Sequence, residues 1–413
     1  MDHKLFQHGQ WRQLWQKPWR QMTAFVISAV APAAARARVI WTTTPRLGKW
    51  IALGALGLAA AVGVTAGVAS HRSLPTLVRA PIATAPVLAA SQQPSAVVNG
   101  HVFVRDTQGA WKELTPKASI GSKDLVAAVF VTDKVGWVTV GHRFERRNDT
   151  LEVYGTSDGG ATWKKVALDQ VGSFQLSALQ ITFVNAHDGW ALASLSEITN
   201  NRPGVLYRTT DGGANWTRIQ APVGGAIQFV SADIGWIIGG RVNYARNLLY
   251  TTQDGGQTWA EQRLDLPFGA ENANVMIGAP AFFSATTGVI AVNREKSVAI
   301  YLTADSGRTW TGAWSFPLQA ADHLALPILA AHGANALLAV GGGVYATSDS
   351  GATWKQIIAN ANLGSALTLG LNANGDGWAV IARGWCPAQF TSRCNNTQLI
   401  TTHDGGVAWA PVK

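Results

Sequence analysis

The chain has 413 residues, of which 47% are hydrophobic and only 14% are charged, and it contains 43 Gly and 18 Trp. Its net charge is +9, but residues 1–49 hold eight of the 33 Lys/Arg and one of the 24 Asp/Glu, so the rest of the chain is close to neutral. This distribution argues against a general nucleic-acid-binding surface. The Gly- and Trp-rich composition favours a turn-rich β architecture.

The first 49 residues form a basic tail. Trp11, Trp15 and Trp19 recur every four residues among Arg12, Lys17 and Arg20, a pattern typical of a helix that lies in the headgroup region of a membrane. The apolar run 23–35 has 13 residues and a Pro. It is therefore predicted to be interfacial, although a second span stays open and would move the rest of the chain to the other side of the membrane.

Residues 50–70 (WIALGALGLAAAVGVTAGVAS) are 21 residues without a charge, long enough to cross a bilayer as a helix. Because the bases precede this segment, the positive-inside rule places the N-terminus in the cytoplasm and the chain after residue 70 outside it. A cleavable signal peptide is the alternative. Residues 71–98 are rich in Pro, Ala and Ser, which predicts a stalk.

From residue 99 to 413 one phrase recurs six times: an Asp in a Gly-rich turn, followed five residues later by Trp. The Asp residues advance by 43 to 55 residues, and a β-branched or aromatic run stands on each side of the turn. This period is typical of propeller blades. The Asp carboxylate can close an Asx-type turn, Gly supplies positive φ and Trp packs between blades. The predicted structural pairs are Asp158/Trp163, Asp211/Trp216, Asp254/Trp259, Asp305/Trp310, Asp349/Trp354 and Asp404/Trp409.

A second motif precedes most of these turns: an apolar run that ends in Gly-Trp, as in FVNAHDGWALA (183–193) and FVSADIGWIIGG (229–240). FFSATTGVIAV (282–292) keeps the Gly and loses the Trp. The turn phrase resembles the Asp box, or bacterial neuraminidase repeat. Together the two motifs are similar to the photosystem II stability/assembly factor-like propellers and, more distantly, to sialidases and sortilin-type receptors. The resemblance implies an all-β propeller that binds a partner and, in a photosynthetic host, helps to assemble photosystem II.

Six complete four-strand units begin near residues 123, 174, 224, 276, 321 and 365. HVFVRDTQGAWKEL (101–114) resembles half of a further unit, so we predict a seven-bladed propeller of four-stranded antiparallel blades, with six blades and a docked hairpin as the alternative.

In a four-stranded meander the loops between second and third strands share one face, and here they are rich in arginine. Arginine binds carboxylate or phosphate with a planar fork, which predicts a binding rim for a protein, peptide or glycan; the alternative is a merely solvated set of loops. The rim residues are Arg143, Arg146, Arg147, Arg202, Arg241, Arg246, Arg294, Arg383 and Arg393.

Cys386 and Cys394 are the only cysteines, and outside the cytoplasm such a pair is expected to form a disulfide. The nine His have no ligand spacing, so no metal or cofactor is expected. The alternative function is a sialidase-like glycosidase acting on anionic glycans. However, Tyr244 alone occupies such a loop, and the arginine motif near the first strand of sialidases does not open this repeat region, so no catalytic residue is assigned.

Overall fold

The structure is a computed structural model. It describes residues 92–412 except for 118–119, 145–148, 170, 172–174, 197–202, 241–246, 266–274, 295, 320–324, 373 and 385–395. The described residues lie in the compact unit Val78–Lys413. The predicted tail, membrane span and most of the stalk lie outside them. Within the described residues, no helix is both long and apolar enough to span a membrane.

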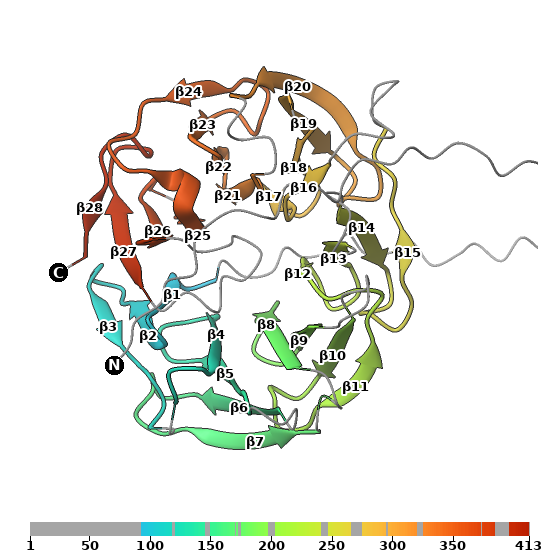
Figure 1. The fold of residues 1–413 in the computed structure, drawn as a ribbon, viewed down its shortest axis with the longest axis vertical. Helices are drawn as coiled ribbons and strands as arrows, with labels where there is room; N and C mark the ends of the chain where they lie inside the picture. Colours follow the sequence, from blue (N-terminus) through green and yellow to red (C-terminus); the bar gives the residue numbers. More distant parts are fainter. Residues whose placement is uncertain are drawn as a thin grey trace, which may run out of the picture. The chain divides into compact units, whose positions relative to one another are not determined.

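Seven antiparallel sheets, which we number as blades 1–7 in chain order, form a ring (Figure 1). The first strand of each sheet from blade 2 onwards lies nearest the ring axis, and the last strand forms the perimeter. The predicted seven-bladed, all-β propeller is therefore confirmed. Blade 1 contributes three described strands, and β1 supplies the second-strand position that the sequence left open.

The strands have the following bounds. Blade 1 comprises β1 (Ser95–Val98), β2 (His101–Arg105) and β3 (Trp111–Glu113). Blade 2 comprises β4 (Leu125–Phe130), β5 (Gly136–His142), β6 (Thr150–Thr156) and β7 (Lys164–Leu168). Blade 3 comprises β8 (Gln175–Phe183), β9 (Gly189–Ser196), β10 (Gly204–Thr209) and β11 (Thr217–Gln220). Blade 4 comprises β12 (Ala226–Phe229), β13 (Gly235–Gly240), β14 (Asn247–Thr252) and β15 (Ala260–Glu261).

Blade 5 comprises β16 (Met276–Ile277), β17 (Ala281–Phe282), β18 (Gly288–Asn293), β19 (Ser297–Thr303) and β20 (Thr311–Pro317). Its innermost strand is divided, because Pro280 between β16 and β17 cannot donate to β18. Blade 6 comprises β21 (Ile328–His332), β22 (Asn335–Val340), β23 (Gly343–Thr347) and β24 (Lys355–Ile357). Blade 7 comprises β25 (Ala366–Leu371), β26 (Gly377–Ala382), β27 (Thr397–Thr402) and β28 (Ala410–Pro411), and the 3-10 turn η3 (Leu363–Ser365) precedes it.

The core is divided into seven apolar clusters, one at each joint between neighbouring blades. Successive side chains of a strand point to opposite faces, so each second strand serves two joints. In β9, for example, Trp190 packs towards blade 4 and Ala191 belongs to the cluster shared with blade 2.

Among the described residues, blades 1 and 7 are joined by side-chain contacts and share no strand. Asn99 and Gly100 form a two-residue turn with φ of 53° and 85°, a conformation that suits Asn-Gly. The Asn99 side-chain oxygen accepts the Thr397 N–H at 2.8 Å, and the Thr397 hydroxyl accepts the Asn99 N–H at 2.9 Å. Arg105 also forms an ion pair with Asp376 of blade 7 at 3.3 Å.

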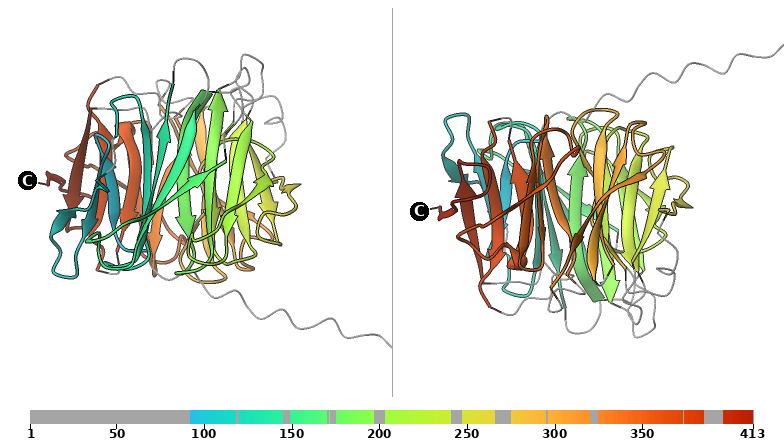
Figure 2. Two further views of the ribbon diagram at one scale, coloured as in Figure 1. Left: turned by 90° about the horizontal axis from the view of Figure 1, so that it is seen from below. Right: turned by 90° about the horizontal axis from the view of Figure 1, so that it is seen from above.

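The two ends of the ring carry different connections (Figure 2). The turn between strands 3 and 4 touches the turn between strands 1 and 2 of the same blade. Gly159 N–H, for example, donates to Lys134 O, and Gly212 N–H donates to His187 O, both at 2.9 Å. We call this end the box face. The connections between strands 2 and 3 lie at the opposite end, which we call the rim.

Candidate functional site

The Asp-box aspartates are engaged within their own turns. The Thr156 hydroxyl donates to Asp158 at 2.8 Å, while the Thr162 N–H and hydroxyl donate to the same carboxylate at 2.9 and 2.6 Å. Gly159 and Gly160 permit the turn with φ of 72° and 83°. The turns of Asp211, Asp254, Asp305, Asp349 and Asp404 repeat the bond from the preceding Thr at 2.8 Å.

These hydrogen bonds favour the charged carboxylate. The Thr162 hydroxyl and backbone N–H lower the pKa of Asp158 to about 2, and Thr353 does the same for Asp349. Partial burial opposes the effect at Asp254, but the Thr258 hydroxyl and N–H still lower its pKa to about 2. A general acid needs a pKa near the working pH. The box aspartates are therefore suited to hold turns rather than to transfer protons.

The box tryptophans complete the same turns. Trp216 Nε1 donates to Gly213 O at 3.1 Å, and its ring meets Phe183 edge-on at 5.9 Å. Trp259, Trp354 and Trp409 make the equivalent hydrogen bond with Gly256, Gly351 and Gly406. Trp163 meets Phe130 edge-on at 6.4 Å, and Trp310 is buried at the joint between blades 4 and 5.

The Gly-Trp motif supplies the deepest contacts between blades. Trp190 is completely buried, stacks on Phe229 of blade 4 at 3.6 Å and donates to Gly255 O at 2.9 Å. Trp137 likewise stacks on Phe183 of blade 3 at 3.5 Å and donates its indole N–H to Gly212 O at 2.8 Å. Sequence reasoning assigned packing between blades to the box Trp; the Gly-Trp indole performs it as well, and the spacing of this motif was the available signal.

The structure describes three of the nine rim arginines. Arg143 follows β5, Arg294 follows β18 and Arg383 follows β26, so they come from blades 2, 5 and 7. Arg146, Arg147, Arg202, Arg241, Arg246 and Arg393 lie outside the described residues, as do Cys386, Cys394 and Tyr244.

Two of these arginines hold buried donors. The Nε atoms of Arg143 and Arg294 are buried, and neither has a hydrogen-bond partner among the described residues. Next to Arg143, the Phe144 side chain is 50% exposed. The fully buried Asp149 carboxylate accepts the backbone N–H groups of Phe144 and Leu176 at 2.8 and 2.6 Å.

A polar network lies at the joint between blades 1 and 2. His142 Nδ1 lies 2.8 Å from Asp124 and its Nε2 lies 3.4 Å from Glu152, which also accepts from the Tyr154 hydroxyl at 2.5 Å and from Lys165 at 3.1 Å. Sequence reasoning missed this network, although Glu152 and Tyr154 stand two residues apart on one strand face.

The Tyr154–Glu152 pair does not have the properties of an activated tyrosine nucleophile, which a sialidase-like glycosidase would need. Burial and the Glu152 carboxylate raise the pKa of Tyr154 above its ordinary value, which disfavours the phenolate. Burial raises the pKa of Glu152, but hydrogen bonds from three side chains lower it by more, so its pKa lies below the ordinary value. The carboxylate is therefore charged, and its oxygens already accept hydrogen bonds. The geometry is that of a structural network.

The fold and these turns define an Asp-box β-propeller. A family model described as photosynthesis system II assembly factor YCF48 matches residues 221–398, which run from blade 4 into blade 7. The photosystem II assembly lipoprotein Ycf48 of Synechococcus sp. (strain CC9902) is 30% identical over 112 residues, which are 25% of this chain and 28% of that relative. The match thus spans little more than a quarter of the curated relative. The chain is an Asp-box propeller similar to the photosystem II assembly factor family.

Solved structures with a similar fold include a YCF48 bound to a D1 peptide, with 16% identity, 81% of this chain and 88% of that chain covered, and a TM-score of 0.40. YCF48 from Cyanidioschyzon merolae has 17% identity, 73% and 88% coverage, and a TM-score of 0.44. The GH74 xyloglucanase of Xanthomonas campestris has 16% identity, 71% and 46% coverage, and a TM-score of 0.48.

Proposed function

We propose that this chain is a non-catalytic binding module of the assembly-factor type, which uses its rim to bind a segment of a partner protein. The similarity to the family model over residues 221–398 and to the curated assembly lipoprotein supports this role. In a photosynthetic host the partner is a component of photosystem II. In any other host it is a different membrane-associated protein.

The observation that carries the proposal is the half-exposed ring of Phe144 beside Arg143 on the rim. Arginine forks bind carboxylates in pairs of hydrogen bonds. Exposed aromatic residues such as Phe144, placed beside arginine, are the composition of interface hot spots.

The chemistry of the rim therefore fits a peptide that carries both a carboxylate and an apolar side chain. The described connections between strands 2 and 3 contain Arg143, Arg294, Lys296 and Arg383 and one acid, Asp149. Asp124, which accepts the backbone N–H of Arg143 at 3.4 Å, lies beside them, so bases still outnumber acids. We propose that the six rim arginines outside the described residues add to this positive charge and outnumber Glu145, Glu197 and Glu295, the acids of the same loops.

The proposed location is the outer side of a membrane. The uncharged segment 50–70 with bases before it supports a cytoplasmic N-terminus and an extracytoplasmic propeller. In right-side-out membrane preparations, added protease should degrade the propeller and spare a tag at residue 1. A protected propeller would contradict this orientation.

The rim is tested by cross-linking the full-length chain to its partner in native membranes and repeating the capture with Arg143→Glu, Phe144→Ala and Arg383→Glu combined. We expect the combined variant to lose at least about 90% of the cross-linked partner, because hot-spot residues each contribute more than about 1 kcal/mol. Lys134→Glu, an exposed charge reversal on the box face, is the matched control and should cross-link like wild type.

A glycosidase is the alternative that the Tyr154–Glu152 contact requires us to test. The raised pKa of Tyr154 argues against it. The purified full-length chain should not hydrolyse a chromogenic sialoside. Turnover that disappears in Tyr154→Phe would instead establish an enzyme and overturn the proposed function.

A further inference from the structure

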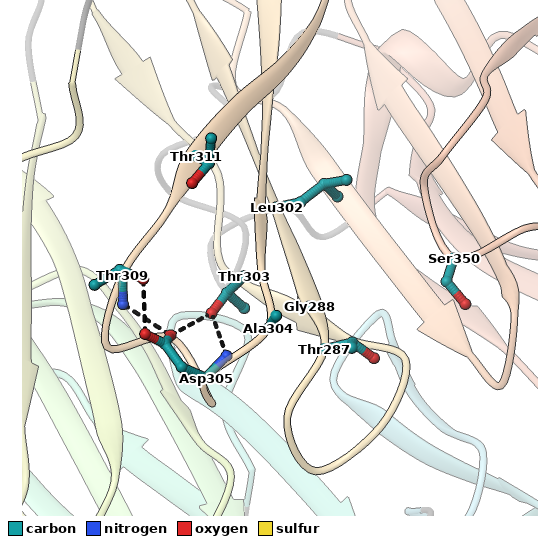
Figure 3. A pocket seen from close by; sticks show the side chains of 9 residues that line it. All are labelled: Thr287, Gly288, Leu302, Thr303, Ala304, Asp305, Thr309, Thr311 and Ser350. Atoms are coloured by element: carbon teal, nitrogen blue, oxygen red, sulfur yellow. Dashed lines mark hydrogen bonds between the residues drawn. The ribbon is translucent and has the colours of Figure 1, made fainter.

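An open cleft of about 420 Å³ lies between blades 5 and 6 on the box face, at the opposite end of the ring from the rim (Figure 3). Leu302 supplies an apolar wall, and Thr287, Thr311 and Ser350 add hydroxyl groups around it. Ser350 comes from the box of blade 6, while the other three residues come from blade 5. The volume falls within the range of small-molecule sites, about 300–1,000 Å³.

The equivalent joint between blades 3 and 4 is filled by two large side chains. Trp190 pairs with Arg208 across β9 and β10, and the guanidinium lies over the indole at 5.7 Å. The indole N–H donates to Gly255 O, which is the residue after the box aspartate of the next blade. Arg208 donates to Asp254 O and Ala232 O at 3.3 Å.

At the joint between blades 5 and 6 both large residues are replaced. Val289 stands at the Gly-Trp position and pairs with Leu302, which stands where blade 3 has Arg208. Val289 is completely buried and Phe283 packs beside it, so the base of the joint is filled. The outer part is not filled, and the cleft lies there.

The acceptor that an indole would use is present in this joint. Ser350 follows the box aspartate Asp349, as Gly255 follows Asp254 and Gly212 follows Asp211. The carbonyls of Gly212 and Gly255 accept indole N–H groups at 2.8 and 2.9 Å. Ser350 is one of the residues that line the cleft, and among the described residues no donor is bonded to its carbonyl.

We propose that this cleft binds the indole ring of a tryptophan side chain presented by a partner polypeptide. The ring packs on Leu302, and its N–H donates to the Ser350 carbonyl. An indole combines a large apolar surface with one donor, which matches an apolar wall beside an acceptor. The joints made by Trp137 and Trp190 within the same ring provide the intramolecular precedents.

Trp314 shows that the box of blade 6 already accepts such a donor from its outer side. Its Nε1 donates to Ala352 O at 2.8 Å, two residues beyond Ser350, and its ring is 38% exposed. Trp314 is not among the residues that line the cleft, and its donor uses the carbonyl of Ala352, so the Ser350 carbonyl is left to the incoming ring.

The test is titration of the full-length chain with N-acetyl-L-tryptophanamide, followed by saturation-transfer NMR. We expect saturable binding with a Kd of about 1 mM, the range for a single buried ring. The 1-methylindole analogue lacks the N–H and should bind about tenfold more weakly. Val289→Trp and Leu302→Arg restore the side chains of blade 3 and should each weaken binding by at least about tenfold.

Ile358→Ser is the control for nonspecific adsorption, because Ile358 is 92% exposed and does not line the cleft; it should bind the amide like wild type. Absence of saturable binding to wild type, or unchanged binding by a folded Val289→Trp or Leu302→Arg variant, would overturn the proposal. If neither variant folds, a photoreactive tryptophan amide on the wild-type chain decides the question. Labelling must map to residues 287–288, 302–311 or 350, and labelling elsewhere refutes the site. None of these readouts involves the rim.

Discussion

At the scale of single residues, the two tryptophan sets differ in depth, which predicts different costs of substitution. Trp190→Phe keeps an aromatic ring but removes the N–H bonded to Gly255 O, leaving a buried carbonyl unpaired and a small cavity. We expect the free energy of unfolding to fall by about 1–3 kcal/mol in urea titrations. Trp216→Phe, in a half-buried box, should cost less. Equal losses of unfolding free energy would show that the Gly-Trp and box tryptophans stabilise the joints between blades to the same extent.

The box carboxylates predict the acid sensitivity of the propeller. The pKa of Asp349 is lowered from 3.8 to about 2 by the Thr353 and Thr347 donors, so the folded state binds its proton less readily than the unfolded chain. The contribution of the Asp349 carboxylate to the stability of the fold is thus fully present above the ordinary aspartate pKa, and it is lost as the pH falls from about 4 towards 2. Asp349→Asn should be less stable than wild type at pH 7, and the difference should shrink by pH 3. A difference independent of pH would contradict this assignment.

At the scale of elements, the repeats could be predicted because the residues that form each turn are adjacent in the sequence. The predicted unit starts near 123, 174, 224, 276 and 365 lie within two residues of β4, β8, β12, β16 and β25, whereas the start near 321 lies seven residues before β21 (328 − 321 = 7). Ring closure could not be predicted, since it joins Asn99 to Thr397 across 298 positions and depends on the short strand β1. The two proposed sites could be predicted only in part. Arginine in variable loops indicated the proposed rim site. The lost Trp in FFSATTGVIAV was the available signal for the cleft, but the pairing of Val289 with Leu302 is known only from the structure.

The noncovalent closure predicts that blades 1 and 7 open before the rest of the ring. Asn99→Ala removes the side-chain oxygen that accepts the Thr397 N–H, although the backbone N–H of residue 99 keeps its bond to the Thr397 hydroxyl. It also places a residue without a polar side chain at φ of 53°. We expect a loss of about 1–2 kcal/mol in local stability. Hydrogen exchange should accelerate in β1, β2, β26 and β27 and stay unchanged in β13. Uniform acceleration around the ring would mean that the blades unfold together.

At the scale of the whole propeller, the two ends of the ring differ in charge. The described turns of the box face contain eleven aspartates, against Lys134 and Arg308 as their only Lys or Arg. The aspartates are Asp106, Asp133, Asp158, Asp188, Asp211, Asp233, Asp254, Asp305, Asp349, Asp376 and Asp404. The lowered pKa values of the box aspartates keep this face negative in mildly acidic conditions too. An anionic partner is therefore attracted to the rim and repelled by the box face.

This polarity predicts how association depends on salt. The association rate with an anionic rim partner should fall as ionic strength rises, because the Debye length shortens to about 8 Å at physiological salt. Arg383→Glu, at an exposed rim position, should lower that rate and flatten its salt dependence. Asp133→Asn, on the box face, should change neither the association rate nor its salt dependence, because Asp133 lies at the opposite end of the ring from the rim. Stopped-flow association across a salt series separates the two. If the two variants had equal effects, the net charge of the propeller, and not the difference in charge between its two ends, would govern association. The rim would then not be the site of first contact.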